Sequence, residues 1–265
     1  VAENAMGYLM RYTQWMVQEI GVDGFRLDAT KHIPTWVLNN YFDQAVYRSN
    51  PRLHLDGSTR HVFSFGENFD GGSAVLQTYV RKDINPNDPG RIGGNRDTKD
   101  FPFYFAAVQN LSSNGLQNDW RNLVNASFDV HDDGLANNGS QGVAFVQSHD
   151  SFGPALSNVA HAYMLTRPGN AIVYFNGKEF GNNRDFPKDG RGDALGGTFG
   201  TTVTTLTTLR NTHGRGNYLP RLTEKETFVV EREKSIVAAF SNRTDAGIDT
   251  RTVQTSFAPG TRLLE

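Results

Sequence analysis

Residues 24–32 read GFRLDATKH, a short apolar run that carries an arginine and an aspartate where a strand should enter a protein core. Side chains two positions apart on a strand point to the same side, so Arg26 and Asp28 are expected to be neighbours. An arginine inside a protein needs an anionic partner, and its charge favours the ionised aspartate. We predict a strand over 24–28 that ends on this pair, either as a structural salt bridge or as part of a reactive site.

Amphipathic helices are predicted on both sides of this strand. Apolar residues recur at helical spacing over 4–20, and Gly21 follows as a stop signal. Pro34 then opens a second segment, 34–48, whose apolar residues again form one face. The order is therefore helix, strand, helix.

The same alternation continues along the chain. We predict further strands over 61–67, 100–105, 142–150 and 170–177, and further helices over 73–82, 106–124, 154–166 and 201–211. Two long polar segments, 83–100 and 177–200, are rich in glycine and are predicted to be surface loops. Five strands alternating with helices indicate an α/β fold with parallel strands joined by right-handed crossovers.

The pattern changes near the C-terminus. Three β-rich runs, TFVVERE at 227–233, SIVAAFSN at 235–242 and RTVQTSFA at 251–258, are separated by turn residues. Such runs predict the beginning of a small antiparallel domain. We therefore expect one domain over 1–215 and a second, incomplete β domain over 216–265.

Composition excludes several classes of partner. The net charge of −2 supplies no basic surface for nucleic acid, and no window approaches the roughly 18 consecutive apolar residues of a membrane helix. The chain has no cysteine, which rules out disulfides, thiolate metal sites and a cysteine nucleophile.

Three of the predicted strands end in acidic residues. Asp28, Glu67 and the pair His149 and Asp150 each follow an apolar run. Loops at the carboxyl ends of parallel strands form the binding face of α/β folds, so three carboxylates are expected on one shared face. Each could instead cap the helix that follows it. An ionised aspartate beside a protonatable glutamate is the pair that retaining glycoside hydrolysis requires.

These segments resemble the α-amylase superfamily of glycoside hydrolases. GFRLDATKH resembles the second sequence region of that superfamily, GENFD at 66–70 the third, and FVQSHD at 145–150 the fourth, and they occur in the same order. PGNAIVYFNGKEFG at 168–181 resembles the segment around the last barrel strand. The resemblance covers roughly residues 5–260 and implies a (β/α)8 barrel.

The resemblance implies roles for particular residues. Asp28 would be the nucleophile, Glu67 the general acid and base, and Asp150 the residue that orients sugar hydroxyls and stabilises the transition state. Arg26 would hold Asp28 ionised, and His149 would bind hydroxyls of the sugar unless it is a satisfied core histidine.

Two more residues belong to the first motif. Lys31 and His32 would lie on the leaving-group side of the cleft, or they would simply belong to a solvated loop. A cluster at 131–133, HDD, lacks a matching partner in the sequence and is expected to be a solvated loop, so no metal ligand is assigned within this chain.

The chain departs from the family pattern in two ways. Ser148 stands where the fourth region usually has asparagine, which would alter a hydrogen bond near the following His-Asp pair. The first sequence region and the first three barrel strands have no counterpart. We therefore expect a partial barrel, about strands 4 to 8, in an internal fragment whose parent holds most ligands of any structural calcium.

The predicted function is retaining hydrolysis of α-glucosidic linkages, mainly α-1,4, in starch or maltodextrins by the full-length parent. The chemistry requires no cofactor, and the isolated 265 residues are expected to be inactive. The resemblance favours a secreted or periplasmic protein. Open alternatives are a transglycosylase or isomerase of the same superfamily, a non-catalytic glycan-binding relative, and a metal-dependent barrel enzyme.

Overall fold

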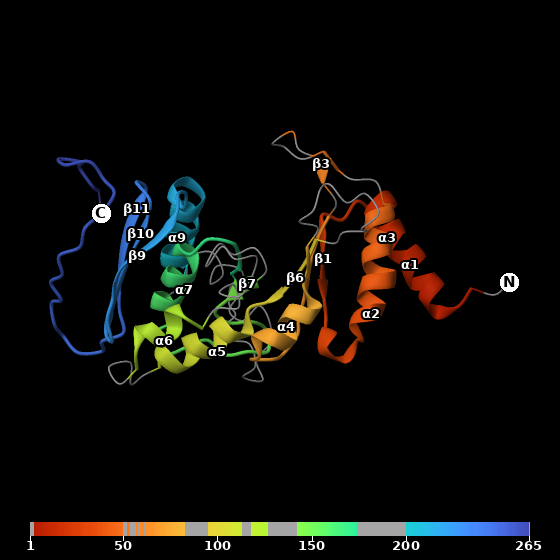
Figure 1. Cartoon of the computed structure of the whole chain (residues 1–265), viewed down its shortest axis with the longest axis horizontal. Helices are drawn as coiled ribbons and strands as arrows, with labels where there is room; N and C mark the ends of the chain where they lie inside the picture. The colour runs from red at the N-terminus through yellow and green to blue at the C-terminus, as the bar shows by residue number, and fades with distance from the viewer. Residues whose placement is uncertain are drawn as a thin grey trace. The chain divides into compact units, whose positions relative to one another are not determined.

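A computed structural model describes residues 3–49, 52–53, 57, 59–60, 62–82, 95–112, 118–126, 142–173 and 200–264. The chain divides into two compact units. The first comprises Val1–Phe101 with Gln141–Val143, and the second comprises Pro102–Ser140 with Ala144–Glu265. Figure 1 traces the helices and strands of both.

The first unit begins with the predicted amphipathic helix. Helix α1 spans Ala5–Trp15 and continues as a π-helical turn, Met16–Ile20. The Asn4 side chain accepts a hydrogen bond from the Gly7 amide at 2.8 Å and so caps the first turn. Gly21 ends the helix with a φ of 82°, a left-handed conformation that glycine adopts without steric cost.

The second predicted helix is also present. A short 3₁₀ turn, Thr30–His32, precedes Pro34, and the helix then runs as α2 (Thr35–Val37), a π-helical turn (Leu38–Phe42) and α3 (Asp43–Arg48). Residues 34–48 were predicted to be helical, and this prediction is confirmed.

A small apolar core joins these helices to the first strand. Val17 and Val46 are buried together with Val62, and Phe25 packs edge-on against Phe42 with ring centroids 5.4 Å apart. Burial of such side chains is the main force that fixes the helices on the strand.

Parallel strands form the sheet of this unit. Strand β1 (Gly24–Leu27) pairs with β4 (Phe63–Gly66), and β4 pairs with β6 (Asn95–Lys99), both in parallel. Helix α4 (Ser73–Tyr79) connects β4 to this last pairing, as a crossover between parallel strands requires.

Short strands complete the first unit. Strand β5 (Arg81–Lys82) pairs antiparallel with β6. A separate two-residue ladder is made by β2 (Arg52–Leu53) and β3 (Thr59–Arg60), also antiparallel.

The position of the third strand differs from the prediction. The segment 100–105 was predicted to be a strand, but Phe101–Asn110 is helix α5. The strand is β6, which lies inside the segment 83–100 that was predicted to be a loop. The apolar run misled the prediction because α5 is itself largely buried, so its sequence lacks a polar face.

The second unit contains the remaining helices of the α/β pattern. Besides most of α5 they are α6 (Trp120–Val124), α7 (Ser157–Thr166) and α9 (Gly200–His213). The break predicted within 106–124 is present, since α5 ends at Asn110 and α6 begins at Trp120.

Two further strands complete the order of the sheet. Strand β7 (Gly142–Phe145) pairs with β6 in parallel through Gly142 and Val143, and β8 (Asn170–Ile172) follows it, so the order is β1-β4-β6-β7-β8. Five strands in this order form a partial (β/α)8 barrel sheet, which confirms the predicted fold class. The end of the predicted strand 170–177 lies outside the described residues.

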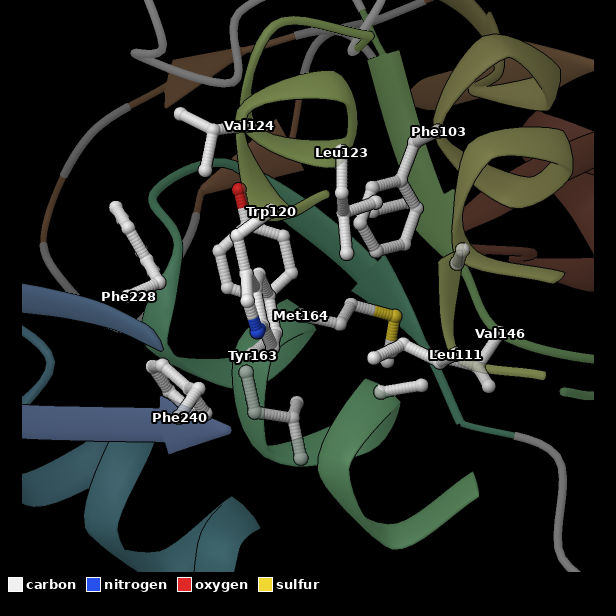
Figure 2. Packing of buried hydrophobic residues seen from close by; sticks show 14 of the residues in the cluster. Phe103, Leu111, Trp120, Leu123, Val124, Val146, Tyr163, Met164, Phe228 and Phe240 are labelled. Carbon is white, nitrogen blue, oxygen red and sulfur yellow. The ribbon is translucent and has the colours of Figure 1, made fainter. Parts of the chain in front are cut away.

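Aromatic side chains dominate the core of the second unit. Trp120, Tyr163, Phe228 and Phe240 surround one another in Figure 2, with ring centroids between 5.3 and 6.2 Å apart. They come from α6, α7 and two strands of the antiparallel sheet, so this cluster unites helices with the C-terminal β structure.

The antiparallel sheet has the three strands that were expected, but not all from the expected segments. Its order is β11 (Ile236–Ser241), β10 (Thr227–Arg232) and β9 (Tyr218–Thr223). The run 251–258 was predicted to be a strand and is irregular, so that prediction is wrong. Strand β9 was missed because Pro220 lies within it, which is tolerated at a sheet edge.

Candidate active site

One arginine connects two of the predicted carboxylates in the first unit. The Arg26 guanidinium lies 2.8 Å from the Asp28 carboxylate through Nη1, and its Nη2 donates to Oε2 of Glu67. The predicted contact between Arg26 and Asp28 is therefore present. Sequence reasoning did not predict that the same guanidinium would also bind Glu67, which is 41 residues away along the chain.

The backbone fixes the ends of the two strands that carry these groups. The Glu67 amide donates to the Leu27 carbonyl at 2.8 Å, and the Thr30 amide donates to the Glu67 carbonyl at 2.9 Å. These bonds extend the β1 and β4 pairing beyond the last ladder residue. The carboxylates of Asp28 and Glu67 thus leave the sheet at the same end of neighbouring strands.

The turn directly after Asp28 is strained. Ala29 has a φ of 45°, one of two positive values at described residues other than glycine. A residue with a Cβ in this region costs about 1 kcal/mol or more, and such residues cluster at functional sites. The turn directs the chain back so that Thr30 lies against Gly66, where an added Cβ would come within 2.9 Å of the threonine Oγ1.

A third cationic contact was not predicted. The Lys99 ammonium lies 2.6 Å from Oε1 of Glu67, and its side chain has no exposed surface. Lys99 is the last residue of β6, next to β4 in the sheet. Only the pairing of these strands brings Lys99 to Glu67, and 83–100 was predicted to be a loop, so the sequence offered no signal for the contact.

Asp28 and Glu67 differ in exposure. The Asp28 side chain is 73% exposed, whereas the Glu67 side chain is only 10% exposed and contacts cations at both of its oxygens. An exposed carboxylate can approach a ligand from solvent. The buried one is held in a fixed orientation by its two ionic partners.

Lys31 and His32 lie in the 3₁₀ turn that follows the strained residue. Both are exposed. The Lys31 ammonium lies 5.3 Å from the centre of the Phe69 ring, which is within the range of a cation–π contact. Phe69 is itself 53% exposed, so it presents an aromatic face beside the glutamate loop.

His149 and Asp150 belong to the second unit, where they follow β7. The strand ends at Phe145, earlier than the predicted end at 150. The His149 ring lies 3.7 Å from the Asp150 carboxylate through Nε2, and both side chains are about half exposed. His149 is therefore not a buried core histidine. The shared face predicted for all three carboxylates stays a prediction, because these residues belong to a different unit.

Serine residues hold Asp150 in place. The Ser148 hydroxyl donates to Asp150 Oδ1 at 2.5 Å, and the Ser151 hydroxyl donates to the same oxygen at 3.2 Å. Ser148, which was predicted to alter a hydrogen bond near the His-Asp pair, thus binds the carboxylate directly. The Tyr104 hydroxyl donates to the Phe152 carbonyl at 2.8 Å, and burial raises the pKa of this tyrosine, with the Asp150 charge acting in the same direction.

Within the described parts of the chain, no group of three potential ligands could hold a metal ion. The HDD cluster at 131–133 lies outside those parts. No helix among the described residues is long and apolar enough to cross a membrane.

Parallel strands in the order β1-β4-β6-β7-β8, with Asp28 and Glu67 directly after two of them, define a partial (β/α)8 barrel that carries carboxylates at strand ends. Among curated proteins, the chain is similar to an α-amylase of Bacillus licheniformis, with 23% identity over 190 residues, 68% of this chain and 32% of that protein. A shorter match, 34% identical over 73 residues, is to a β/α-amylase of Paenibacillus polymyxa and covers 28% of this chain and 5% of that protein. No family model matches the chain.

Solved structures show the same fold. The crystal structure of AmyP in complex with maltose has a TM-score of 0.64 at 15% identity and covers 92% of this chain and 60% of that one. The α-amylase of Geobacillus thermoleovorans complexed with acarbose has a TM-score of 0.58 at 19% identity and covers 89% and 52%. These similarities support the predicted resemblance to the α-amylase superfamily.

The chain spans about a third of the Bacillus licheniformis relative and about half of the Geobacillus structure. This partial coverage agrees with the predicted partial barrel.

Proposed function

We propose that the complete protein containing this chain hydrolyses α-glucosidic linkages of starch or maltodextrins, mainly α-1,4, with retention of anomeric configuration. The observation that carries the proposal is the Arg26 guanidinium, which contacts both Asp28 and Glu67. One cation thereby holds a carboxylate nucleophile and a carboxyl acid at the ends of adjacent strands. Relatives named as α-amylases give the substrate class.

The proposed reaction has two displacements. Glu67 donates a proton to the bridging oxygen while Asp28 attacks the anomeric carbon, so the C–O bond of the linkage breaks and a glycosyl ester forms. Glu67, now ionised, then takes a proton from water, whose oxygen displaces the ester and releases Asp28 as the carboxylate. The exposure of Asp28 suits it to attack, and Arg26 forms an ion pair with it.

Other predicted site residues have supporting roles in the proposal. Asp150, held by Ser148, would orient sugar hydroxyls, and His149 beside it would bind them. Lys31 and His32 are exposed on the turn after Asp28, where they can contact the leaving-group sugar.

The proposal concerns the complete protein, because five strands leave a (β/α)8 barrel open. We propose that 1–215 form the later part of the barrel and 216–265 the start of the β domain, and that the isolated chain is inactive. Structural calcium would be bound mainly by residues outside this chain, and the family resemblance favours export.

The test is proton NMR of the first hydrolysis product of maltooligosaccharides made by the complete protein. Retention predicts that the α-anomer appears first and then mutarotates. Asp28→Asn should lower turnover by at least about 10⁴-fold, because the nucleophile is lost. Asp23→Asn, which removes an exposed carboxylate just before the same strand, is the matched control and should remain active. A β-anomer as the first product, or near-normal activity of Asp28→Asn, would refute the proposal.

A transglycosylase is the second candidate. The chain is also similar in fold to a cyclomaltodextrin glucanotransferase, with a TM-score of 0.58 at 19% identity and coverage of 89% of this chain and 52% of that one. The same carboxylates would serve both reactions, and the acceptor would be a sugar hydroxyl in place of water. Longer or cyclic products from maltohexaose would identify transfer, whereas only shorter products would identify hydrolysis.

A further inference from the structure

An exposed aromatic pair lies on the helix that follows the Asp28 turn. Trp36 belongs to α2 and is 54% exposed, and its ring centroid lies 6.0 Å from that of Tyr41, which is partly buried. The ring planes meet at 64°, an edge-to-face contact. Leu38, two positions after Trp36, is buried on the opposite side of the helix, so the Trp36 ring faces solvent.

A π-helical turn brings the two rings together. In an α-helix, side chains five residues apart point about 140° away from each other. In the turn Leu38–Phe42, the Asp43 amide donates to the Leu38 carbonyl five residues back, so side chains five apart lie nearly in line. The contact between Trp36 and Tyr41 therefore depends on this departure from α-helical geometry. Single π turns inside helices are frequent at functional sites.

Buried polar contacts hold the π-helical turn on the sheet. The Asn39 side chain accepts a hydrogen bond from Arg96 of β6 at 2.7 Å, and the Asn39 carbonyl accepts one from Arg81 of β5 at 3.4 Å. Arg96 also lies 3.2 Å from the Asp43 carboxylate, and both of these side chains are almost fully buried. The turn is thus fixed from its inner side, and Trp36 lies on its exposed side.

The aromatic pair follows the candidate site along the chain. The first turn of a helix that follows a barrel strand lies near the carboxyl end of that strand, where active sites of such barrels form. Trp36 is in this first turn after β1, and Asp28 lies directly after the same strand. Lys31 and His32 lie in the turn between them, and the proposed function assigns these two residues to the leaving-group sugar.

We propose that Trp36 and Tyr41 form a sugar-binding platform that contacts an α-glucan beyond the leaving-group sugar and so favours longer chains. The faces of a glucose ring carry C–H bonds, so an aromatic ring and a sugar face lose contact with water together when they stack. Tryptophan and tyrosine supply this contact area with few rotatable bonds to order. The inference rests on the proposed function for the identity of the ligand.

The first experiment measures two kcat/KM values of the complete protein, one for maltoheptaose and one for nitrophenol release from 4-nitrophenyl α-maltotrioside, whose leaving group carries no sugar. Trp36→Ala should lower the maltoheptaose value by about 3- to 10-fold more than the trioside value. The loss should be mainly in KM, because the platform binds substrate and transition state alike. Trp36→Tyr keeps an aromatic ring and should recover most of the loss. An unchanged ratio of the two values in Trp36→Ala would overturn the proposal.

Trp15→Ala is the matched control. The Trp15 side chain is 46% exposed, and its ring centroid also lies 6.0 Å from an aromatic neighbour, Tyr12. It belongs to α1, which leads into the start of β1, at the opposite end of that strand from Asp28. Its replacement should leave the ratio of the two kcat/KM values unchanged. A change in this ratio equal to that of Trp36→Ala would overturn the proposal.

The second experiment needs no activity and uses the 265-residue chain. Its three tryptophans give indole N–H signals in NMR, which are assigned by their loss in Trp15→Ala, Trp36→Ala and Trp120→Phe. Millimolar maltoheptaose should shift the Trp36 signal and leave the Trp15 and Trp120 signals in place. An unmoved Trp36 signal, which would assign this face to a partner other than a glucan, would overturn the proposal.

The two experiments separate the platform from the proposed function. A shifted Trp36 signal in the chain, together with a complete protein that hydrolyses no α-glucan, would support the platform and refute the proposed function. A complete protein that hydrolyses α-glucans with the same ratio of kcat/KM values in Trp36→Ala would refute the platform and leave the proposed function intact.

Discussion

Trp120 is the centre of the aromatic core, and its replacement tests whether that core holds the second unit together. The side chain is fully buried, and its ring centroid lies 5.3 Å from Tyr163, 5.8 Å from Phe228 and 5.7 Å from Phe240 (Figure 2). Trp120→Ala removes all three ring contacts and leaves a cavity. We expect the free energy of unfolding to fall by about 3 to 5 kcal/mol, the usual cost of such a deletion.

Trp120→Phe is the matched variant, and its expected effect is much smaller. The indole Nε1 is buried and has no hydrogen-bond acceptor among the described residues. Phenylalanine keeps most of the ring contacts and removes this unpaired donor, whose burial costs about 1 to 3 kcal/mol. Removing the unpaired donor stabilises the fold and offsets much of the packing lost with the smaller ring. The free energy of unfolding should therefore stay within about 1 kcal/mol of the parent value.

Amide hydrogen exchange is the suitable assay because it reports the two units separately. Strand β10 supplies Phe228 and lies in the middle of its sheet, so its amides should lose protection in Trp120→Ala and keep it in Trp120→Phe. Amides of β1 in the first unit serve as the internal reference. Equal loss of protection in both variants, or no loss in Trp120→Ala, would refute this account of the core.

Three further outcomes are expected. His161 is buried, and desolvation lowers its pKa, so below about pH 6.5 the unfolded chain binds more protons than the folded one. The free energy of unfolding should therefore fall as the pH drops below about 6.5. Urea unfolding of His161→Gln should show no such fall. Gly24→Ala should cost about 1 to 3 kcal/mol in thermal unfolding, because its Cβ would lie 2.7 Å from the Phe63 carbonyl oxygen; an unaltered melting temperature would contradict this. Ser148→Ala should lower kcat/KM of the complete protein about tenfold, equivalent to about 1.4 kcal/mol, because Asp150 loses a hydrogen bond that holds it. Ser148→Asn should recover part of the lost kcat/KM.

Periodicity predicted the elements whose apolar residues share one face. The helices over 4–20 and 34–48 and the strand at 24–27 are present, and each packs part of its apolar face on its neighbours, as Val17, Val46 and Phe25 do. This pattern is visible in a single segment of sequence. The contact between Arg26 and Asp28 was predictable for the same reason, since Asp28 directly follows the strand that carries Arg26 and the pair needs no information about the rest of the fold.

Strand β6 was not predictable in this way. Its sequence, NRDTK, is polar, yet the side chains of 96–99 are all buried. Their burial depends on partners far along the chain, such as the Glu67 carboxylate bound by Lys99 and the Asp43 carboxylate bound by Arg96. Local composition indicated a solvated loop because the compensating charges lie on other strands and helices.

The most direct test of the central claim is to trap the glycosyl ester on Asp28. Glu67→Gln in the complete protein lacks the base for the second step, whereas an α-maltosyl fluoride has a leaving group that needs no acid for the first. The account predicts that peptide mass spectrometry finds one maltosyl group on the peptide carrying Asp28, and none when Asp28→Asn is added. The account is contradicted if the parent protein hydrolyses maltooligosaccharides but the Glu67→Gln variant, treated with the fluoride, carries no maltosyl group on Asp28.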